Sequence, residues 1–160
     1  MIKDNVFEKT CCFTGHRNIP FGRARHISKC LEKTIEDLLE QGFIYFGAGG
    51  ALGFDTLASK AVIKVRKRHP EIKLILVLPC KTQADSWACA DRQTYEEIKV
   101  QADKVVYISE EYTKGCMLER NRHLVNSSSV CVCYLTKDTG GTSYTVKYAK
   151  QKGLRIINLA

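Results

Sequence analysis

Short apolar runs alternate along the chain with segments in which apolar residues recur every three or four positions. The runs are typical of buried strands, and the spaced segments are typical of amphipathic helices. Strands are expected at residues 11–14, 43–46, 74–78, 104–108, 130–135 and 155–159. Helices are expected over 27–39, 54–65, 91–102, 117–127 and 143–152. Strands that alternate with helices predict right-handed crossovers and therefore an α/β fold.

The expected strands also predict the layers of this fold. Residues 74–78 and 130–135 are almost continuously apolar, as strands are when helices cover both faces of a sheet. We therefore expect a mostly parallel sheet with helices on both faces, which is a three-layer α/β sandwich. A length of 160 residues suits one such domain, so residues 1–160 are predicted to form a single domain.

Composition is that of an ordinary globular protein, with 44% hydrophobic and 26% charged residues. No apolar run approaches the roughly 20 residues that cross a bilayer, and MIKDNVFEKT at the start lacks the apolar region of a secretion signal. These features predict a cytoplasmic protein without a membrane partner.

Four cysteines lie inside expected strands: Cys11, Cys12, Cys131 and Cys133. This position favours reduced, buried thiols. No second Cys or His pair at zinc spacing accompanies them, so no metal site is expected.

The net charge of +8 is concentrated in part between Lys60 and Lys73, where six Lys or Arg residues accompany a single Glu. Such a segment can bind nucleic acid, or it can be the solvated end of a helix whose cations complement its dipole. No aromatic residues interleave with these charges, as a surface that stacks bases would require. The solvated helix is therefore the favoured interpretation.

Two segments that follow expected strands are rich in glycine and lead into helices: GAGGALGFD at 47–55 and TKDTGGTS at 136–143. Ligands of parallel α/β sheets bind beyond the carboxyl ends of the strands. Glycine lets the backbone approach a ligand closely, and a helix N-terminus presents unpaired N–H groups that suit phosphate. The pattern predicts a phosphate-bearing ligand, and tight turns that bind nothing are the alternative.

Two common nucleotide motifs do not fit these segments. Leu52 stands where the dinucleotide fingerprint G-x-G-x-x-G needs its third glycine, and the third expected strand ends in Pro79 rather than in an acidic residue. The loop G-x-x-x-x-G-K-[ST] is missing as well. A common NAD-dependent dehydrogenase and a P-loop NTPase are therefore disfavoured.

The second glycine turn, GGTSYT at 140–145, offers a more open anion site. Gly140 and Gly141 are expected to expose main-chain N–H groups. Thr142 is expected to cap the following helix and to offer its hydroxyl to an anion. An ordinary helix cap after a flexible turn is the alternative.

Five segments together resemble the YspA/YpsA-like branch of the SLOG superfamily, which also contains the DNA-processing protein DprA and the LOG phosphoribohydrolases. They are TGHR, GGALGFDTLA, QADSWACADRQTYEEI, GCMLERNRHLVNSS and GGTSYTVKYAKQKG, in this order over nearly the whole chain. The resemblance implies a Rossmann-like fold with a pocket for a nucleotide or a nucleotide-derived ligand. The positions that match the turns of the family are Thr14, Gly15, His16 and Arg17, then Gly49, Gly50, Gly53 and Asp55, then Gly140, Gly141 and Thr142.

The resemblance does not extend to the catalytic pattern of the LOG enzymes. That pattern, Pro-Gly-Gly-x-Gly-Thr-x-x-Glu, contains a Glu that takes part in cleaving an N-glycosidic bond. In this chain Asp138 and Thr139 replace the proline region, one glycine is lost, and Val146 or Lys147 stands near the position of the Glu. The LOG catalytic Glu therefore has no counterpart, and whether the protein is an enzyme stays open.

Polar residues beside these turns are candidates for ligand contact. Arg17 suits a phosphate, His16 suits general acid or base chemistry, and Asp55 suits a ribose hydroxyl or a water. A surface arginine, a structural histidine and a first-turn acid are the respective alternatives. In ERNRHL, Arg120 and Asn121 are expected to face the cleft while Leu118 and Val125 pack, with surface ion pairs as the alternative.

One further segment is a candidate lid over the pocket. It contains Gln83, Trp87, Arg92 and Tyr95. Trp87 could stack on a base, although packing in the core is the favoured interpretation for a lone Trp.

The leading functional hypothesis is a domain that binds or senses a nucleotide derivative such as an ADP-ribose- or NAD-like molecule, with no certain cofactor. Main-chain amides and Arg17 would hold the phosphates, and Asp55 the sugar. The alternatives are a hydrolase of an N-glycosidic or phosphate bond that uses Asp55 or His16, and a DprA-like module for single-stranded nucleic acid. A homo-oligomer is a further expectation.

Overall fold

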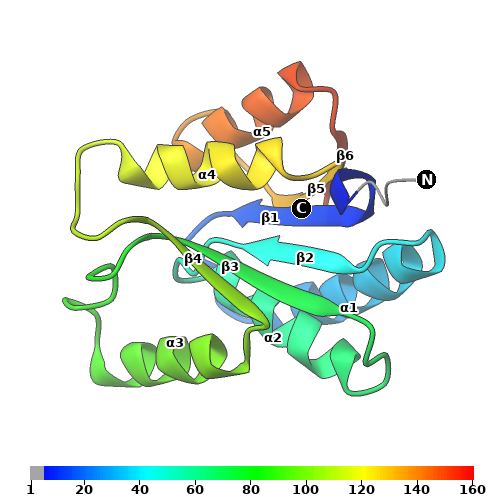
Figure 1. Ribbon diagram of the computed structural model, residues 1–160, viewed down its shortest axis with the longest axis horizontal. Helices are drawn as coiled ribbons and strands as arrows, with labels where there is room; N and C mark the ends of the chain where they lie inside the picture. The colour runs from blue at the N-terminus through cyan, green and yellow to red at the C-terminus, as the bar shows by residue number, and fades with distance from the viewer. Residues whose placement is uncertain (1–5) are drawn as a thin grey trace.

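The computed structural model describes residues 6–160, which form alternating strands and helices (Figure 1). The strands are β1 (Thr10–Gly15), β2 (Tyr45–Ala48), β3 (Lys73–Cys80), β4 (Lys104–Ser109), β5 (Val130–Tyr134) and β6 (Arg155–Asn158). The helices are α1 (Ala24–Glu40), α2 (Phe54–Arg66), α3 (Cys89–Gln101), α4 (Cys116–Asn126) and α5 (Gly141–Gln151), and a short 3-10 helix, η1 (Val6–Lys9), precedes β1.

Within these residues the six strands form one sheet in the order β4-β3-β2-β1-β5-β6, and all neighbouring strands are parallel. The chain builds outward from β1 to β4 and then returns through α4 to β5 on the other side of β1. The strand order therefore reverses between β1 and β5, and in open α/β sheets a ligand crevice forms beyond the carboxyl ends at such a point.

Helices lie on both faces of the sheet, so the expected three-layer Rossmann-like α/β sandwich is confirmed. Figure 1 shows α4 and α5 on one face and α1, α2 and α3 on the other. A core with Phe13, Phe46 and Phe54 at its centre lies under α1 and α2. A second core lies under α4 and α5 and contains Cys12, Cys131 and Cys133. The cysteines are all free thiols, as the sequence predicted.

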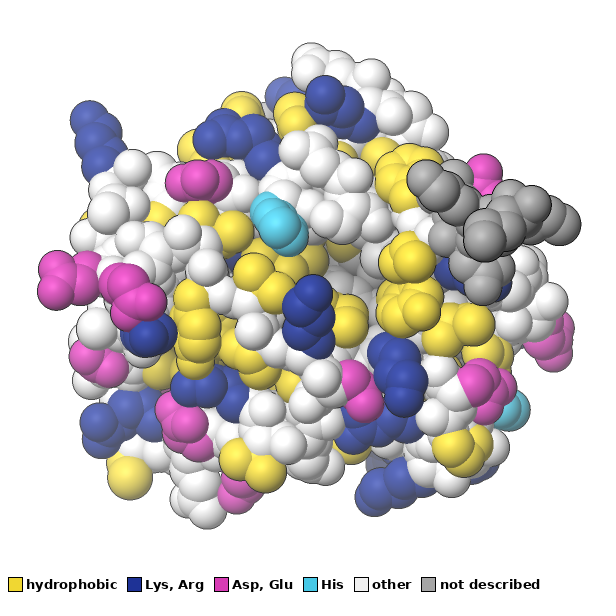
Figure 2. Space-filling view, in the orientation of Figure 1, with side chains coloured by type: hydrophobic (Ala, Val, Ile, Leu, Met, Phe, Trp, Pro, Cys, Tyr) yellow, Lys and Arg dark blue, Asp and Glu magenta, His cyan; other side chains and the backbone are white. Residues whose placement is uncertain are grey.

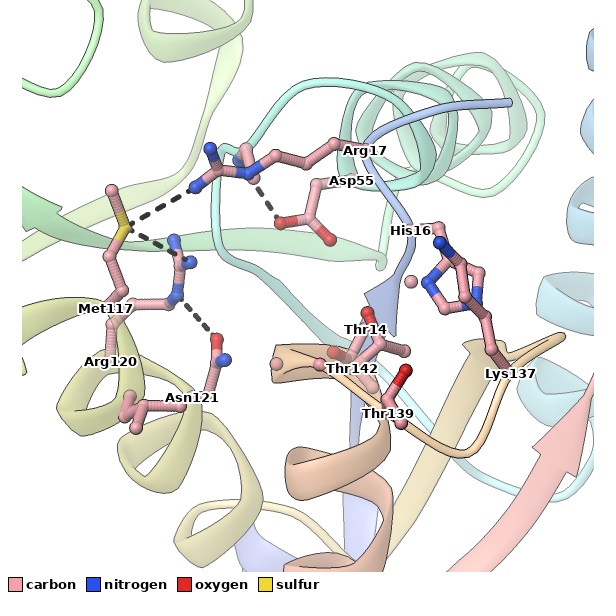
Figure 3. A pocket seen from close by; sticks show the side chains of 15 residues that line it. Thr14, His16, Arg17, Asp55, Met117, Arg120, Asn121, Lys137, Thr139 and Thr142 are labelled. Atoms are coloured by element: carbon pink, nitrogen blue, oxygen red, sulfur yellow. Dashed lines mark hydrogen bonds between the residues drawn. The ribbon is translucent and has the colours of Figure 1, made fainter. Parts of the chain in front are cut away.

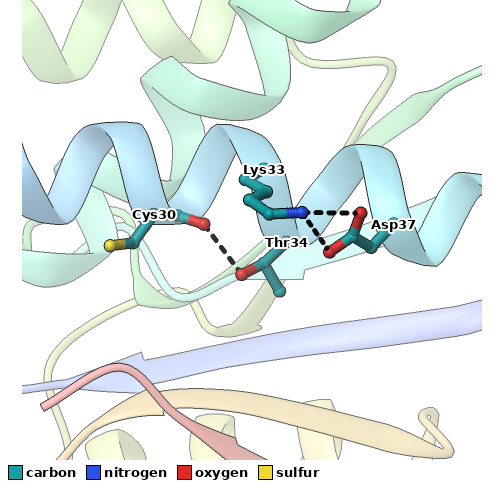
Figure 4. Close-up of polar contacts among 4 residues, drawn as sticks. All are labelled: Cys30, Lys33, Thr34 and Asp37. Atoms are coloured by element: carbon teal, nitrogen blue, oxygen red, sulfur yellow. Dashed lines mark hydrogen bonds and ion pairs between the residues drawn. The ribbon is translucent and has the colours of Figure 1, made fainter.

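Helix α1 illustrates why these segments are helical. Ile27, Leu31, Ile35 and Leu38 recur at helical spacing and are buried. On a more exposed part of the helix, the ammonium of Lys33 pairs with the carboxylate of Asp37 one turn later, 3.2 Å away (Figure 4). Such exposed pairs contribute only about 0.3–0.5 kcal/mol, so burial of the apolar stripe provides most of the stabilisation.

The strand after α1 begins two residues later than the sequence predicts. The N–H of Phe43 donates to Leu38 O and closes the end of α1, so this residue belongs to the helix cap rather than to β2. Gly42 makes this turn with φ +96°.

None of the helices among residues 6–160 combines the length and apolarity needed to cross a bilayer.

Candidate functional site

A cavity of about 330 Å³ lies at the switch point between β1 and β5 (Figure 3). Its walls come from the segments that follow β1, β2 and β5 and from the start of α4. The expected site residues along it are Thr14, Gly15, His16, Arg17, Asp55, Arg120, Asn121, Gly140, Gly141 and Thr142. The volume falls near the lower end of the range for small-molecule pockets, about 300–1,000 Å³.

His16 connects the two strands that frame the cavity. Its Nε2 accepts a hydrogen bond of 2.9 Å from the N–H of Thr136, which follows β5, and its carbonyl accepts from the N–H of Phe54. Nε2 can accept only in the neutral ring, so Nδ1 carries the proton in this arrangement. Burial, together with the positive charge of Lys137, lowers the pKa of His16. The ring thus fixes the position of the loop after β5.

The glycines of the first turn do not line the cavity, although Ala51 in the same turn does. A Cβ on Gly49 would lie 2.8 Å from the guanidinium of Arg120, and a Cβ on Gly50 would lie 2.4 Å from Leu78. Gly53 has φ +78°, and a Cβ there would lie 2.1 Å from the carbonyl oxygen of Arg17. Close packing against protein atoms therefore accounts for these three glycines.

Arg120 passes from α4 across the end of the sheet to this turn. It is only 4% exposed, its Nη1 donates to the carbonyl of Gly49, and its Nε donates to Asn121 Oδ1 at 2.7 Å. Burial lowers the pKa of the Arg120 guanidinium, and the nearby carboxylate of Asp55 partly offsets this effect. Arg120 lines the cavity, as expected, and this buried contact with the backbone takes the place of the surface ion pairs that were the alternative.

Asp55 lies in the first turn of α2 and is 6% exposed. Its Oδ2 accepts from the N–H of Ala51 at 3.1 Å, whereas its Oδ1 is buried without a hydrogen-bond partner. Burial raises the pKa of this carboxyl, and Arg120, the N–H of Ala51 and Arg17 act in the opposite direction. Figure 3 shows the side chain of Arg17 extending past Asp55 toward Met117.

The N-terminus of α5 opens toward the cavity. Gly140 is the N-cap residue, with φ +93°, and a Cβ on either Gly140 or Gly141 would meet nothing within 4 Å. The expectation that Thr142 caps this helix is wrong, because the helix begins at Gly141 and Thr142 lies inside its first turn. Thr142 still lines the cavity. Helix geometry leaves the first N–H groups without intrahelical partners, so they are available to an anion.

Five lining residues were missed by the sequence analysis: Ala51, Met117, Leu118, Lys137 and Thr139. Lys137 is the one with a sequence signal, because it is a cation directly after an apolar strand and just before a glycine turn. Arg17 and Lys137 add positive charge to the helix N-terminus, and Asp55 is the only acidic group among the described lining residues. The cavity is therefore suited to an anion.

The expected lid does not cover this cavity. Gln83 and Tyr95 are buried, and the Gln83 side-chain amide lies 3.4 Å from the carbonyl oxygen of Gly50, behind the first glycine turn. Trp87 packs edge-on against Tyr95, with ring centroids 5.2 Å apart. The favoured interpretation of Trp87 as a packing residue agrees with this contact.

Among residues 6–160, no group of three or more His, Cys, Asp or Glu side chains is arranged to hold a metal ion.

A comparison with protein families matches residues 11–156 to the YspA SLOG family. This match spans most of the chain. The protein belongs to the YspA SLOG family.

Relatives of this YspA SLOG protein occur in Bacillus and related bacteria. A UPF0398 protein of Halalkalibacterium halodurans is 33% identical over 140 residues, which are 86% of this chain and 71% of the relative. The SPbeta prophage-derived protein YoqJ of Bacillus subtilis is 29% identical over 130 residues, which are 73% of this chain and 76% of that protein.

Solved structures of DNA processing protein A (DprA) share the fold of this YspA SLOG protein. The Streptococcus pneumoniae protein aligns with a TM-score of 0.68 at 20% identity over 97% of this chain, which spans about half (51%) of that protein. The Helicobacter pylori protein aligns with a TM-score of 0.69 at 19% identity, over 96% of this chain and 66% of the Helicobacter pylori chain. The structure of that protein concerns the mode in which it binds single-stranded DNA. At these identities the likeness shows the fold alone.

Proposed function

We propose that this YspA SLOG protein binds a nucleotide or a nucleotide-derived ligand, such as an ADP-ribose- or NAD-like molecule, in the crevice between β1 and β5. Phosphate would lie against the first N–H groups of α5, with Arg17 and Lys137 on either side. The observation that carries this proposal is the open N-terminus of α5, where space remains beside both Gly140 and Gly141 within a cavity lined by two exposed cations.

Asp55 supplies the second element of the proposal. A carboxylate only accepts hydrogen bonds, so its unpartnered Oδ1 suits a donor such as a ribose hydroxyl. Arg17 is exposed, and its guanidinium contacts only the sulfur of Met117, at 3.8 Å, among the hydrogen bonds of the described residues. Movement of Arg17 toward a phosphate would open the approach to Asp55.

Isothermal titration with ADP-ribose, NAD, AMP and adenosine tests this proposal. Binding of the phosphorylated compounds, with adenosine at least tenfold weaker, is the expected result, because charge-assisted hydrogen bonds contribute about 1.5–3 kcal/mol each. Arg17→Ala should lower the affinity for the phosphorylated ligands by roughly tenfold or more. Arg23→Ala removes an exposed arginine outside the lining and is the matched control. Absence of binding by all four compounds would overturn the proposal.

Two alternatives give different results in the same experiments. A hydrolase would form nicotinamide or a free base from NAD or AMP, and Asp55→Asn would abolish the product. A module for single-stranded nucleic acid would bind oligothymidine with an affinity that falls steeply with salt. The basic segment of α2 does not favour this module, because Lys64 pairs with Glu32 and Arg66 pairs with Asp103.

A further inference from the structure

The sulfur of Met117 lies between two guanidinium groups at the wall of the cavity between β1 and β5 (Figure 3). Nη2 of Arg17 and Nη2 of Arg120 each lie 3.8 Å from Met117 Sδ. Met117 and Arg120 are three residues apart on α4 and therefore share one face of that helix, whereas Arg17 follows β1. Met117 thus joins an exposed cation to a buried one.

A thioether sulfur is a weak acceptor for these two donors. Arg120 is only 4% exposed, and among the described residues its Nη2 donates to no acceptor other than Met117 Sδ. The guanidinium of Arg17 likewise has no second hydrogen-bond partner in the described part of the chain. Burial is the main cause of the lowered pKa of Arg120, and the positive charge of Arg17 lowers it further. Two neighbouring cations therefore share an acceptor that satisfies neither of them well.

Position, rather than exposure, distinguishes Met117 from other apolar residues. Figure 2 shows hydrophobic side chains at the surface over much of the face in view, and apolar residues at a protein surface are ordinary. Met117 is partly buried and lines the cavity, so a small molecule can reach its sulfur from solvent. It therefore combines access from solvent with two cationic donors directed at its sulfur.

We propose that Met117 is a site of reversible oxidation that regulates ligand binding, with hydrogen peroxide as the oxidant. The sulfur attacks one peroxide oxygen, and an S–O bond forms as the O–O bond breaks. The second oxygen takes up the hydrogen of the first and leaves as water, so the thioether is oxidised to a sulfoxide and the peroxide is reduced. A methionine sulfoxide reductase reverses the change, releasing the oxygen as water while two thiols become a disulfide.

The two guanidinium groups favour the sulfoxide product. Oxidation converts an apolar side chain into a polar one, and the new oxygen extends into the gap that separates the sulfur from Arg17 and Arg120. Hydrogen bonds in which the donor is ionised are roughly twice as strong as neutral ones. The sulfoxide oxygen therefore gives both cations the acceptor that the thioether does not provide.

The effect on ligand binding rests on the proposed function. Arg17 is the cation that would move to the phosphate and open the approach to Asp55. A charge-assisted hydrogen bond to the sulfoxide holds Arg17 at Met117 and opposes this movement. Oxidation therefore lowers the affinity for phosphorylated ligands. The contact between the sulfoxide and the two arginines does not depend on what the ligand is.

Peroxide treatment of the full chain, followed by peptide mass spectrometry, tests the modification. Catalase and a thiol reductant then remove the peroxide and reverse the reducible cysteine products, whereas the sulfoxide remains. Met117 should gain one oxygen atom, and isothermal titration should show roughly fivefold to tenfold weaker binding of ADP-ribose. Methionine sulfoxide reductase should restore the affinity. Met117→Leu is the matched control, because it retains Met1 and the eight cysteines, and peroxide should not change its affinity.

Met117→Gln tests the hydrogen bonds without peroxide, because an amide oxygen also accepts from a guanidinium. This variant should bind ADP-ribose several-fold more weakly than Met117→Leu does. The melting temperature is a readout that needs no ligand. Peroxide should leave the melting temperature of the wild type unchanged or raise it, because the sulfoxide oxygen is paired with two donors.

Four results would overturn the proposal. They are the absence of sulfoxide at Met117, equal ADP-ribose affinities before and after its formation, binding by Met117→Gln as tight as by Met117→Leu, and a fall in melting temperature on oxidation that Met117→Leu does not share. A sulfoxide that forms without a loss of melting temperature, in a protein that binds none of the four compounds even before treatment, would refute the proposed function alone.

Discussion

The guanidinium of Arg120 occupies the space that a side chain on Gly49 would need. A Cβ at that position would lie 2.8 Å from Nη1 of Arg120, and the same group donates to the carbonyl of Gly49. Arg120 comes from α4 on one face of the sheet, whereas Gly49 precedes α2 on the other face. The contact therefore joins the two helical layers at the carboxyl ends of the strands, beside the cavity.

We expect Gly49→Ala to displace Arg120 and to loosen this end of the sheet. Insertion of a methyl group into a packed region costs typically 1–3 kcal/mol, so the free energy of unfolding should fall by about this amount. Urea denaturation measures the change. Nucleotide affinity should fall with it, because Arg120 lines the cavity.

Gly47→Ala, two residues earlier in β2, is the control for this prediction. Its Cβ would lie 3.0 Å from Cδ2 of Leu124, the end of a flexible side chain that can shift. The loss of stability should be smaller than for Gly49→Ala. Equal losses would show that the contact between Arg120 and Gly49 has no special role.

Gly141→Ala should separate ligand binding from stability. A Cβ there meets nothing within 4 Å, and alanine favours a helix over glycine by as much as about 1 kcal/mol. The melting temperature should stay constant or rise. The added methyl group would lie where a phosphate approaches α5, so calorimetry should show at least a tenfold loss of affinity for phosphorylated ligands. Adenosine affinity is the control and should not change, and unchanged affinity for ADP-ribose would contradict the placement of phosphate.

The sequence predicted the order of elements and most of the residues around the cavity. Periodicity is a local property, so the six strands and five helices could be read along the chain. The role of the first glycine turn could not, because Gly49 and Gly50 are close to Arg120 and Leu78, which are distant in sequence. A glycine that leaves room for a protein side chain and a glycine that leaves room for a phosphate give the same sequence pattern.

Stability should depend on the protonation of His16. Its pKa is lowered from the ordinary value of 6.5, first by burial and second by Lys137. The unfolded chain therefore binds the proton at a higher pH than the folded chain does. The stabilisation from neutral His16 is complete above about pH 6.5 and is lost as the pH falls toward the lowered pKa.

His16→Gln tests this dependence, because an amide oxygen can still accept from the N–H of Thr136 but does not titrate. Melting temperatures between about pH 8 and pH 5 should fall more steeply for the wild type than for the variant. Parallel curves would mean that the ring does not hold the loop after β5 through its neutral form.

Arg66 should matter for stability and not for ligand binding. Its Nη1 pairs with Asp103 at 2.7 Å and its Nη2 donates to Gln101 O at 2.8 Å, so it joins the end of α2 to the end of α3 and to the turn before β4. Asp103 Oδ2 also accepts from the N–H of Leu74 at 2.8 Å, which makes the arrangement a network rather than an isolated surface pair. Arg66→Ala should lower the free energy of unfolding by about 1–2 kcal/mol in urea denaturation, because hydrogen bonds to charged groups contribute more to stability than hydrogen bonds between neutral groups.

The control is Lys67→Ala, at the exposed position next to Arg66, which should change the free energy of unfolding by less than about 0.5 kcal/mol. If Arg66→Ala instead left stability unchanged and weakened retention of single-stranded DNA, the basic end of α2 would be a nucleic-acid surface, contrary to its ion pairs.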